Sequence, residues 1–357
     1  MRSHPDACPG AVELHAAADG GLARIRVPGG TLSAAQWDVV RLASLELGSG
    51  SIELTSRANL QIRGLADGVE LGARLAAAGL LPSASHERIR NIIAAPLEDN
   101  QALVDEIDAA LCADPALASL PGRFLVTAGA SVSGLGGDIG LVSGDVGPAG
   151  NDAPGAARPA SVAAPGIRSA TPSTWILLLA GRDTGVRVTD PVDAVVTAAR
   201  LFQQLRGTSW RLSEVDDGVR KITAHFGATE APRFTPVVTP VAPSPVTPGV
   251  PLGRLDAHQL PGVPLRLTPW RSLVVPAGTD TSGLITDPAS PWHGVSACTG
   301  RPGCAKSLSD VRADARAWLG TPHDRPVHWS GCARRCGRPA GDVTEFVATG
   351  DGYEEIR

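Results

Sequence analysis

The stretch SIELTSRANLQIRGL, residues 51–65, predicts two short strands that are separated by a break. Apolar and polar residues alternate on both sides of Arg57-Ala58-Asn59, which is the period of a half-buried strand. Asparagine in the break is typical of turns, because its short polar side chain tolerates unusual backbone angles. We therefore expect two adjacent strands joined at residues 57–59.

The segments on either side extend this pattern. Residues 21–27 alternate like a strand, and residues 32–47 carry apolar residues at helical spacing behind Ser33, a plausible N-cap. Residues 68–80 predict a second helix, which ends near Gly79. The order strand, helix, strand, strand, helix is most of a ferredoxin-like α+β unit.

A second α/β unit is expected from about Arg88 onwards. Its expected strands and helices are residues 88–96, 101–112, 122–129, 138–144, 173–181, 186–190 and 194–207. The segment 130–172 is rich in Gly, Ala, Ser and Pro, so most of it predicts a long loop. A proline-rich connector, expected to be extended, follows from Ala231 to Pro251.

A faint internal repeat suggests that the architecture is duplicated. ELTSRANLQI (53–62) and RLTPWRSLVV (266–275) share Leu, Thr and a later Leu in register, and both end in apolar β-formers. The chain then divides into a first ferredoxin-like half-domain, a reductase-like α/β domain, the connector, a shortened second half-domain and a cysteine-bearing domain. Their expected bounds are 1–82, 83–230, 231–252, 253–285 and 286–357.

Composition excludes several classes of protein. A net charge of −4 argues against a general nucleic-acid binder. No apolar run reaches the ~18–20 residues that span a bilayer, and the N-terminus lacks the apolar core of a signal peptide. We therefore expect a cytoplasmic protein without a membrane or nucleic-acid partner. Its oligomeric state is not predictable from these features.

Four of the six cysteines gather in the last 60 residues. Cys298 and Cys304 form a C-x5-C pair, and Cys332 and Cys336 form a C-x3-C pair. Structural zinc usually takes pairs of C-x2-C to C-x4-C, whereas a [4Fe–4S] cluster is a larger body that accepts wider spacing. Both centres stay possible on spacing alone, and the cluster is favoured.

The other two cysteines have simpler interpretations. Cys112 ends an apolar-periodic helix and is expected to be a core thiol, and Cys8 has no second cysteine near it in the sequence. Between the two cysteine pairs, Val311, Ala315 and Trp318 fall on one helical face. That segment predicts a packing helix, in which Trp318 belongs to the core.

Taken together, CTGRPGC, SGCARRC and ELTSRANLQIRG resemble the siroheme-dependent sulfite and nitrite reductase superfamily. RIRNIIAAPL (88–97) and LPGRFLVTAG (120–129) look like two further segments of it. The resemblance implies a nitrite/sulfite reductase-like α+β fold with pseudo-twofold halves. It also implies a [4Fe–4S] cluster on Cys298, Cys304, Cys332 and Cys336, where the last cysteine bridges to siroheme iron in the reductases.

Within this superfamily the chain is most similar to the precorrin-3B synthases. Five segments carry that resemblance in order along the chain: 6–30, 266–276, 283–288, 312–318 and 327–357. In one place the chain departs from the sulfite reductases, which carry a second lysine where Leu125 stands here. A sulfite site needs converging cations, so this loss favours the branch whose small substrate is uncharged O2.

The resemblance also implies substrate, cofactors and partners. The synthases are O2- and NADH-dependent monooxygenases that convert precorrin-3A, a tetrapyrrole with eight carboxylates, to precorrin-3B. NADH is expected to act through a partner reductase or ferredoxin, since no dinucleotide-binding G-x-G-x-x-G follows a strand. The family implies a non-haem iron, whose ligands are not readable; His293, His323 and His328 are interpreted as loop or supporting residues. The alternative is a siroheme-dependent sulfite or nitrite reductase, and a cluster- or zinc-bearing sensor or scaffold is disfavoured.

Arginine binds carboxylates through two parallel hydrogen bonds, so arginines are the expected ligands of such a substrate. The tetrapyrrole-binding candidates are Arg57, Arg90 and Arg123, with Asn59, Gln61 and Arg63 as weaker neighbours. Residues 298–338 add a local excess of five positive charges, with eight basic side chains against three aspartates.

Overall fold

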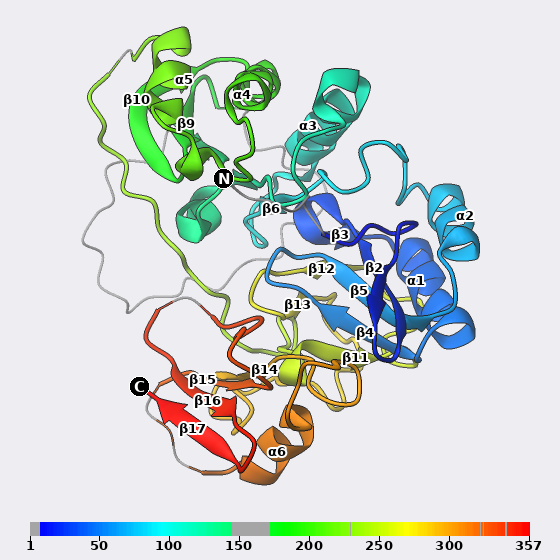
Figure 1. The fold of residues 1–357 in the computed structure, drawn as a ribbon. Coiled ribbons are helices and arrows are strands. Elements are labelled where there is room, and N and C mark those ends of the chain that lie inside the picture. Colours follow the sequence, from blue (N-terminus) through cyan, green and yellow to red (C-terminus); the bar gives the residue numbers. More distant parts are fainter. Residues whose placement is uncertain (1–7, 145–171, 229, 322, 324, 340) are drawn as a thin grey trace. The chain divides into compact units, whose positions relative to one another are not determined.

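The computed structural model describes residues 8–144, 172–228, 230–321, 323, 325–339 and 341–357. Most of the loop predicted over 130–172 lies outside these residues. The chain divides into two compact units (Figure 1). Unit 1 contains residues 1–8, 28–30 and 83–240, and unit 2 contains residues 9–27, 31–82 and 241–357. The two predicted half-domains and the cysteine-bearing segment fall mainly in unit 2.

Unit 2 is built around a five-stranded antiparallel sheet with the order β1-β2-β5-β4-β11. Its strands are His15–Ala17, Gly20–Ile25, Leu60–Leu65, Ser51–Leu54 and Arg254–Asp256. Helix α1 (Ala34–Leu47) packs against β4 and β5, with α2 (Val69–Ala77) beside it (Figure 1). As predicted, Ser33 is the N-cap of α1, and it forms a capping box with Gln36.

Two further sheets belong to unit 2. A small sheet has the order β13-β12-β3, with strands Leu273–Val274, Leu265–Leu267 and Thr31–Leu32. The C-terminal sheet has the order β14-β15-β16-β17, with strands Val295–Ala297, Val327–Ser330, Thr344–Ala348 and Tyr353–Ile356. The first three strands of the C-terminal sheet run parallel, and the predicted packing helix α6 (Val311–Trp318) contacts β14 and β15. Trp318 is half-buried against Trp329 and Phe346, which agrees with its predicted packing role.

Unit 1 has its own five-stranded sheet, with the order β10-β9-β8-β7-β6. Its strands are Arg182–Val188, Trp175–Leu179, Ile139–Ser143, Val126–Ala128 and Ile92–Ala94. Its helices are α3 (Gln101–Ala113), α4 (Pro191–Leu205) and α5 (Gly218–Phe226). The unit has its own hydrophobic core. In it Phe124, two residues before β7, stacks on Phe202 of α4 with 5.7 Å between the ring centroids.

The predicted internal repeat corresponds to two turns of the same geometry in unit 2. In the first turn, Thr55 N–H donates to Asn59 O at 2.9 Å, and Ala58 has a φ of 53°. In the second, Thr268 N–H donates to Ser272 O at 3.0 Å, and Arg271 has a φ of 56°. In both, the threonine hydroxyl accepts two backbone N–H groups of its own turn. The three shared residues thus mark one conformation that is used twice.

The sequence prediction missed several short elements. Helix α5 was not expected, and neither were β1, β3 or the four strands of the C-terminal sheet. In the described residues, no helix has both the length and the apolar character that crossing a bilayer requires.

Candidate functional site

The four clustered cysteines lie on two loops that leave the same edge of the C-terminal sheet. Cys298 directly follows β14, and Cys332 lies two residues beyond β15. These two strands are parallel neighbours, so their carboxyl ends meet at one edge. The Cys298 N–H donates to Trp329 O at 2.9 Å, which extends the pairing to the first cysteine.

The two cysteine loops pack tightly against each other. Leu308 N–H donates to Gly331 O at 2.8 Å, and Gly331 N–H donates to the Cys298 Sγ at 3.2 Å. A Cβ at Gly331 would stand 1.9 Å from the Ser307 hydroxyl, so only glycine allows this approach. The second loop is also fixed at its far end, where the His328 Nε2 lies 3.2 Å from Cys336 O.

The thiols at this edge form no disulfide, and their charges influence one another. No disulfide involves Cys298, Cys304, Cys332 or Cys336. Burial raises the pKa of Cys298; the N–H donors of Gly331 and Gly300 oppose that rise, and negative charge on Cys336 and Cys304 adds to it. These three thiols therefore lie within electrostatic reach of one another. Among the described residues, however, no three His, Cys, Asp or Glu side chains converge as a ready metal site.

The donor set suits a thiolate-ligated centre. Four free thiols on two interlocked loops, with an amide N–H already directed at one sulfur, are what an iron–sulfur cluster uses. Cys298, Cys304, Cys332 and Cys336 are therefore the residues that could hold such a cluster.

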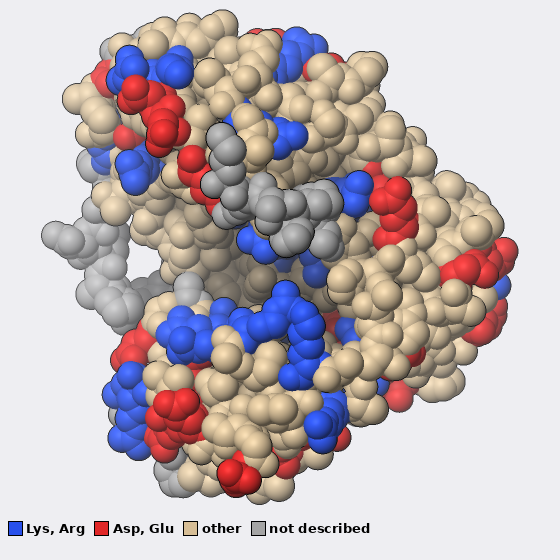
Figure 2. Space-filling model, in the orientation of Figure 1, with Lys and Arg blue, Asp and Glu red and all other residues tan. Residues whose placement is uncertain are grey.

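Basic side chains surround these loops. Figure 2 shows a band of Lys and Arg over the part of unit 2 where Figure 1 places the loops beside β14 and β15. Three carboxylates outside residues 298–338 reduce the charge excess predicted there. Glu345 pairs with both Arg335 and Arg338, and the remaining pairs are Arg312–Glu53 and Arg325–Asp342.

Four predicted tetrapyrrole-binding residues lie in unit 2 with the cysteines. Arg57 is half-buried on the first turn. Asn59 is buried, and its Oδ1 accepts the Val27 N–H at 2.9 Å, so it stabilises the turn. Gln61 is half-buried on β5, opposite Glu53 of β4. Arg63 donates to both oxygens of Asp19, each at 2.9 Å.

The other two predicted arginines belong to unit 1. Arg90 is buried and forms a bidentate ion pair with Asp108 of α3, with a shortest distance of 2.6 Å. Arg123 is exposed, and its guanidinium lies 4.8 Å from the centre of the Trp210 ring. Arg90 thus already has a carboxylate partner within the chain. Leu125 is 3% exposed, so the position occupied by lysine in the reductases is apolar core here.

The histidines near the cysteines are engaged in hydrogen bonds. His328 is fully buried, and its Nδ1 lies 2.9 Å from the Ser296 hydroxyl. Burial, and secondarily the charge of Arg271, lowers the pKa of His328 to about 4, so it is neutral near pH 7. His323 contacts the carbonyl groups of Thr321 and His293. The interpretation of His293, His323 and His328 as loop or supporting residues stays a prediction.

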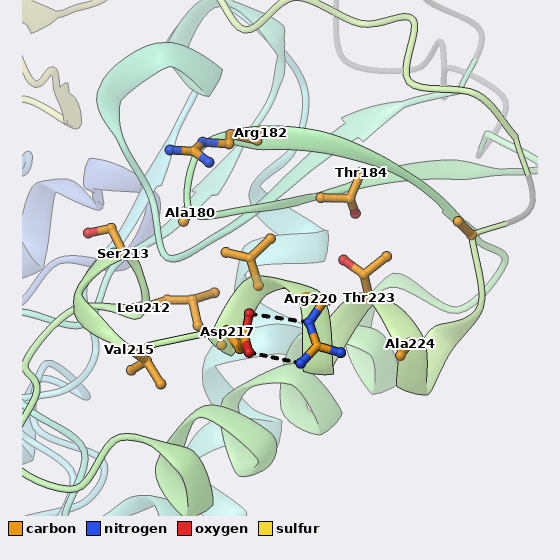
Figure 3. Close-up of a pocket in the computed structure, with 13 residues that line it drawn as sticks. Ala180, Arg182, Thr184, Leu212, Ser213, Val215, Asp217, Arg220, Thr223 and Ala224 are labelled. Carbon is orange, nitrogen blue, oxygen red and sulfur yellow. Dashed lines mark hydrogen bonds and ion pairs between the residues drawn. The ribbon is translucent and has the colours of Figure 1, made fainter.

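Unit 1 contains an open cavity of about 690 Å³ between β10, the segment 212–218 and α5. Arg182 and Thr184 line it from β10, and Thr223 lines it from α5 (Figure 3). Asp217 and Arg220 point toward each other at its wall and form an ion pair at 2.9 Å (Figure 3). The predicted site residues are absent from the described residues that line this cavity.

Several residues at the cysteine loops were missed from the sequence. Arg271 donates to the carbonyl of Gly337, directly after Cys336, and Glu53 pairs with Arg312, which was counted among the basic side chains but not given this contact. Arg271 had a weak signal, since it lies in the repeat directly after Trp270, which aligns with the candidate Arg57. Glu53 had none, because its partner is far away in the sequence.

Comparison with known proteins agrees with this architecture. Residues 15–69 match the family model described as nitrite/sulfite reductase ferredoxin-like half domain. Among solved structures, the chain is similar to the NirA protein of Mycobacterium tuberculosis, with a TM-score of 0.64 and 19% sequence identity. That similarity covers 94% of this chain and 73% of the other. The search of curated proteins found no match. The chain therefore has the nitrite/sulfite reductase-like fold, and residues 15–69 form a ferredoxin-like half domain of that type.

Proposed function

We propose that the protein is a precorrin-3B synthase: an O2- and NADH-dependent monooxygenase that converts precorrin-3A to precorrin-3B. The reaction hydroxylates the C20 meso carbon and forms a γ-lactone with the ring A acetate. One oxygen atom of O2 enters the product, and the other leaves as water with the two electrons of NADH. A partner reductase or ferredoxin in the cytoplasm would pass these electrons from NADH to the protein. The reaction would also need a non-haem iron, held by residues other than the four cysteines.

The observation that carries the proposal is the pair of interlocked cysteine loops. Cys298 and Cys304 on one loop and Cys332 and Cys336 on the other would hold a [4Fe–4S] cluster, which supplies one-electron transfer when bound. The basic side chains around the loops suit both the negative charge of four thiolates and an acidic substrate. Arg57 stands on the turn that carries the family's tetrapyrrole-binding arginine, and it would bind a substrate carboxylate.

The buried Leu125 favours the proposed monooxygenase over an enzyme that reduces sulfite or nitrite. Sulfite and nitrite are small anions that need several cations directed at one point. Leu125 is 3% exposed and packs in unit 1, so it cannot contribute a charge there. O2 is uncharged and has no such requirement.

A second candidate is a siroheme-dependent sulfite or nitrite reductase. The half-domain match and the structural likeness to NirA suit this activity at least as well as the first. The two candidates differ in the tetrapyrrole: siroheme would remain bound as a cofactor in the reductase, whereas the synthase would convert precorrin-3A and release it as precorrin-3B.

One purification distinguishes them. The protein isolated without oxygen should contain about four irons with matching sulfide and lack the strong visible bands of siroheme. Cys298→Ser and Cys336→Ser should lose the cluster, whereas Cys112→Ser, at a half-buried position on α3 of unit 1 rather than in the predicted core, should keep it. Incubation with precorrin-3A, O2, NADH and a reductase should then add one oxygen atom to the substrate, measured by mass spectrometry.

Two outcomes would contradict the proposal. Zinc without acid-labile sulfide would exclude the cluster. Siroheme bands, together with sulfite or nitrite reduction and no change in precorrin-3A, would assign the second candidate.

A further inference from the structure

Arg63, Arg271 and Arg312 come from three separate parts of unit 2, and each donates to the backbone carbonyl of a cysteine or of a residue adjacent to one. We call them the arginine triad. They lie on β5, in the second turn of the repeat and on α6. Their acceptors are Gly303 O, Gly337 O and Cys298 O, respectively.

Arg63 connects the first half-domain to the turn that carries Cys304. It is 8% exposed, and its Nη2 donates to Gly303 O at 2.5 Å while the guanidinium also pairs with Asp19. Burial opposes its charge, but the hydrogen bond to Asp19 and the negative charges of Glu53 and Cys304 outweigh burial and raise the pKa of Arg63. Its charge is therefore stabilised beside the cysteine.

Arg312 connects Cys298 to the central sheet of unit 2. It is 6% exposed, its Nη2 lies 2.7 Å from Glu53 Oε1, and its Nε donates to Cys298 O at 3.3 Å. Glu53 is 6% exposed on β4, so this ion pair is shielded from water. A planar guanidinium can bind a carboxylate and a carbonyl together, whereas a lysine ammonium has no such fixed fork.

Arg271 fixes the loop that carries Cys336. Its Nη2 donates to Gly337 O at 3.1 Å, directly after that cysteine. Burial lowers the pKa of Arg271, the charge of Arg312 lowers it further, and Glu53 opposes both. An anionic centre at the cysteine loops would oppose both effects and favour the charged form of Arg271.

We propose that Arg63, Arg271 and Arg312 are positioning residues for the four-thiolate cluster. Each holds one cysteine-bearing turn through a backbone carbonyl, and together they offset the negative charge of the thiolates. This inference rests on the proposed cluster, and it moves Arg63 from the substrate to the cysteine loops. Mutation of residues that support metal ligands in this way typically lowers metal affinity by ~10–100-fold.

Hydrogen exchange of the metal-free, reduced full-length protein tests the positioning role. Arg63→Gln should speed amide exchange around residues 299–307, Arg312→Gln around 295–300, and Arg271→Gln around 332–338. The control is Arg74→Gln on α2, because Arg74 pairs with Glu46 and Glu70 and contacts none of these loops. Faster exchange throughout α1 as well would indicate general unfolding and contradict a local role.

Cluster release tests the link to the proposed function. In the loaded protein, each Gln variant should lose iron to a ferrous chelator ~10-fold faster than Arg74→Gln does. The Gln variants should also shift the reduction potential, followed by EPR, to more negative values, because reduction adds negative charge. Arg312→Lys should retain the reduction potential, because it keeps the positive charge. It should release iron as fast as Arg312→Gln, because an ammonium cannot bind Glu53 and the Cys298 carbonyl together as the planar guanidinium does.

The outcomes separate the two claims. If the loaded wild-type protein and all three variants release iron like Arg74→Gln, the positioning role is wrong and the cluster stands. If the wild-type protein contains no iron and sulfide, the proposed function fails and this inference fails with it.

Discussion

The two turns of the internal repeat, Thr55–Asn59 and Thr268–Ser272, have one backbone geometry and two different tasks. In each, a threonine hydroxyl accepts two N–H groups, and the fourth residue has a positive φ. The side chains at the last three positions differ completely: Arg57, Ala58 and Asn59 in one turn; Trp270, Arg271 and Ser272 in the other. The geometry thus depends on threonine, and the other side chains are free to specialise.

The fourth position shows this specialisation most clearly. Ala58 is 2% exposed and belongs to the core of unit 2. Arg271, at the same place in the second turn, reaches Gly337 beside Cys336. A positive φ costs ~1–2 kcal/mol for a residue with a Cβ, so a non-glycine residue there needs a compensating contact. At Arg271 this contact is the hydrogen bond to the cysteine loop.

The largest expected difference between the turns comes from glycine at the fourth position. Arg271→Gly relieves the backbone strain but removes the bond to Gly337, so iron release to a chelator should become ~10–100-fold faster. Ala58→Gly relieves the same strain, loses a buried methyl group worth ~0.8 kcal/mol, and should change neither release nor the unfolding midpoint appreciably. Equal release rates for the two variants would show that the turns do not differ in this task.

A smaller difference between the turns is expected at the third position, which is Arg57 in the first turn and Trp270 in the second. Arg57→Ala should weaken binding of uroporphyrin, a stable octacarboxylate porphyrin, by about tenfold, because a charge-assisted hydrogen bond contributes ~1.5–3 kcal/mol. Fluorescence titration at two salt concentrations measures this, and the salt dependence should fall with the affinity. Trp270→Ala removes no charge and should leave the salt dependence unchanged. Loss of salt dependence in Trp270→Ala but not in Arg57→Ala would remove Arg57 from the proposed site.

The sequence predicted features that depend on local periodicity. Strand β4, strand β5, helix α1 and the Ser33 cap follow from alternation, helical spacing and capping chemistry, and all were predicted. Strands β14 and β15 were missed, because runs of three and four buried residues show no period. Cysteine spacing identified the candidate ligands, but their approach to one another depends on the parallel pairing of these missed strands.

The arginines were harder to assign. All of them fit a carboxylate-binding role by residue type, and nothing local separates a substrate arginine from a supporting one. The contact with Gly303 identifies Arg63 as a supporting residue, and the contact with Glu53 does the same for Arg312. In both cases the partner lies more than two hundred residues away in the sequence. Such pairs form only when the half-domain and the cysteine loops fold together.

The smallest expected difference concerns the threonines that the turns share. Thr268 is fully buried, and its hydroxyl accepts the N–H groups of Trp270 and Ser272 and lies 2.6 Å from the Ser272 hydroxyl. Thr268→Val keeps the shape but leaves those buried groups without their acceptor, which should cost about 2 kcal/mol and lower the unfolding midpoint by ~4–8 °C.

Thr55 is half-buried, so water can replace its hydroxyl in the first turn. Thr55→Val should therefore cost only ~0.5–1 kcal/mol, measured as a shift of the midpoint in thermal unfolding followed by circular dichroism. Because neither hydroxyl touches a cysteine, both variants should keep the cluster. If Thr55→Val proved as damaging as Thr268→Val, burial would not explain the difference, and the first turn would need a rigid backbone for its own task, the presentation of Arg57.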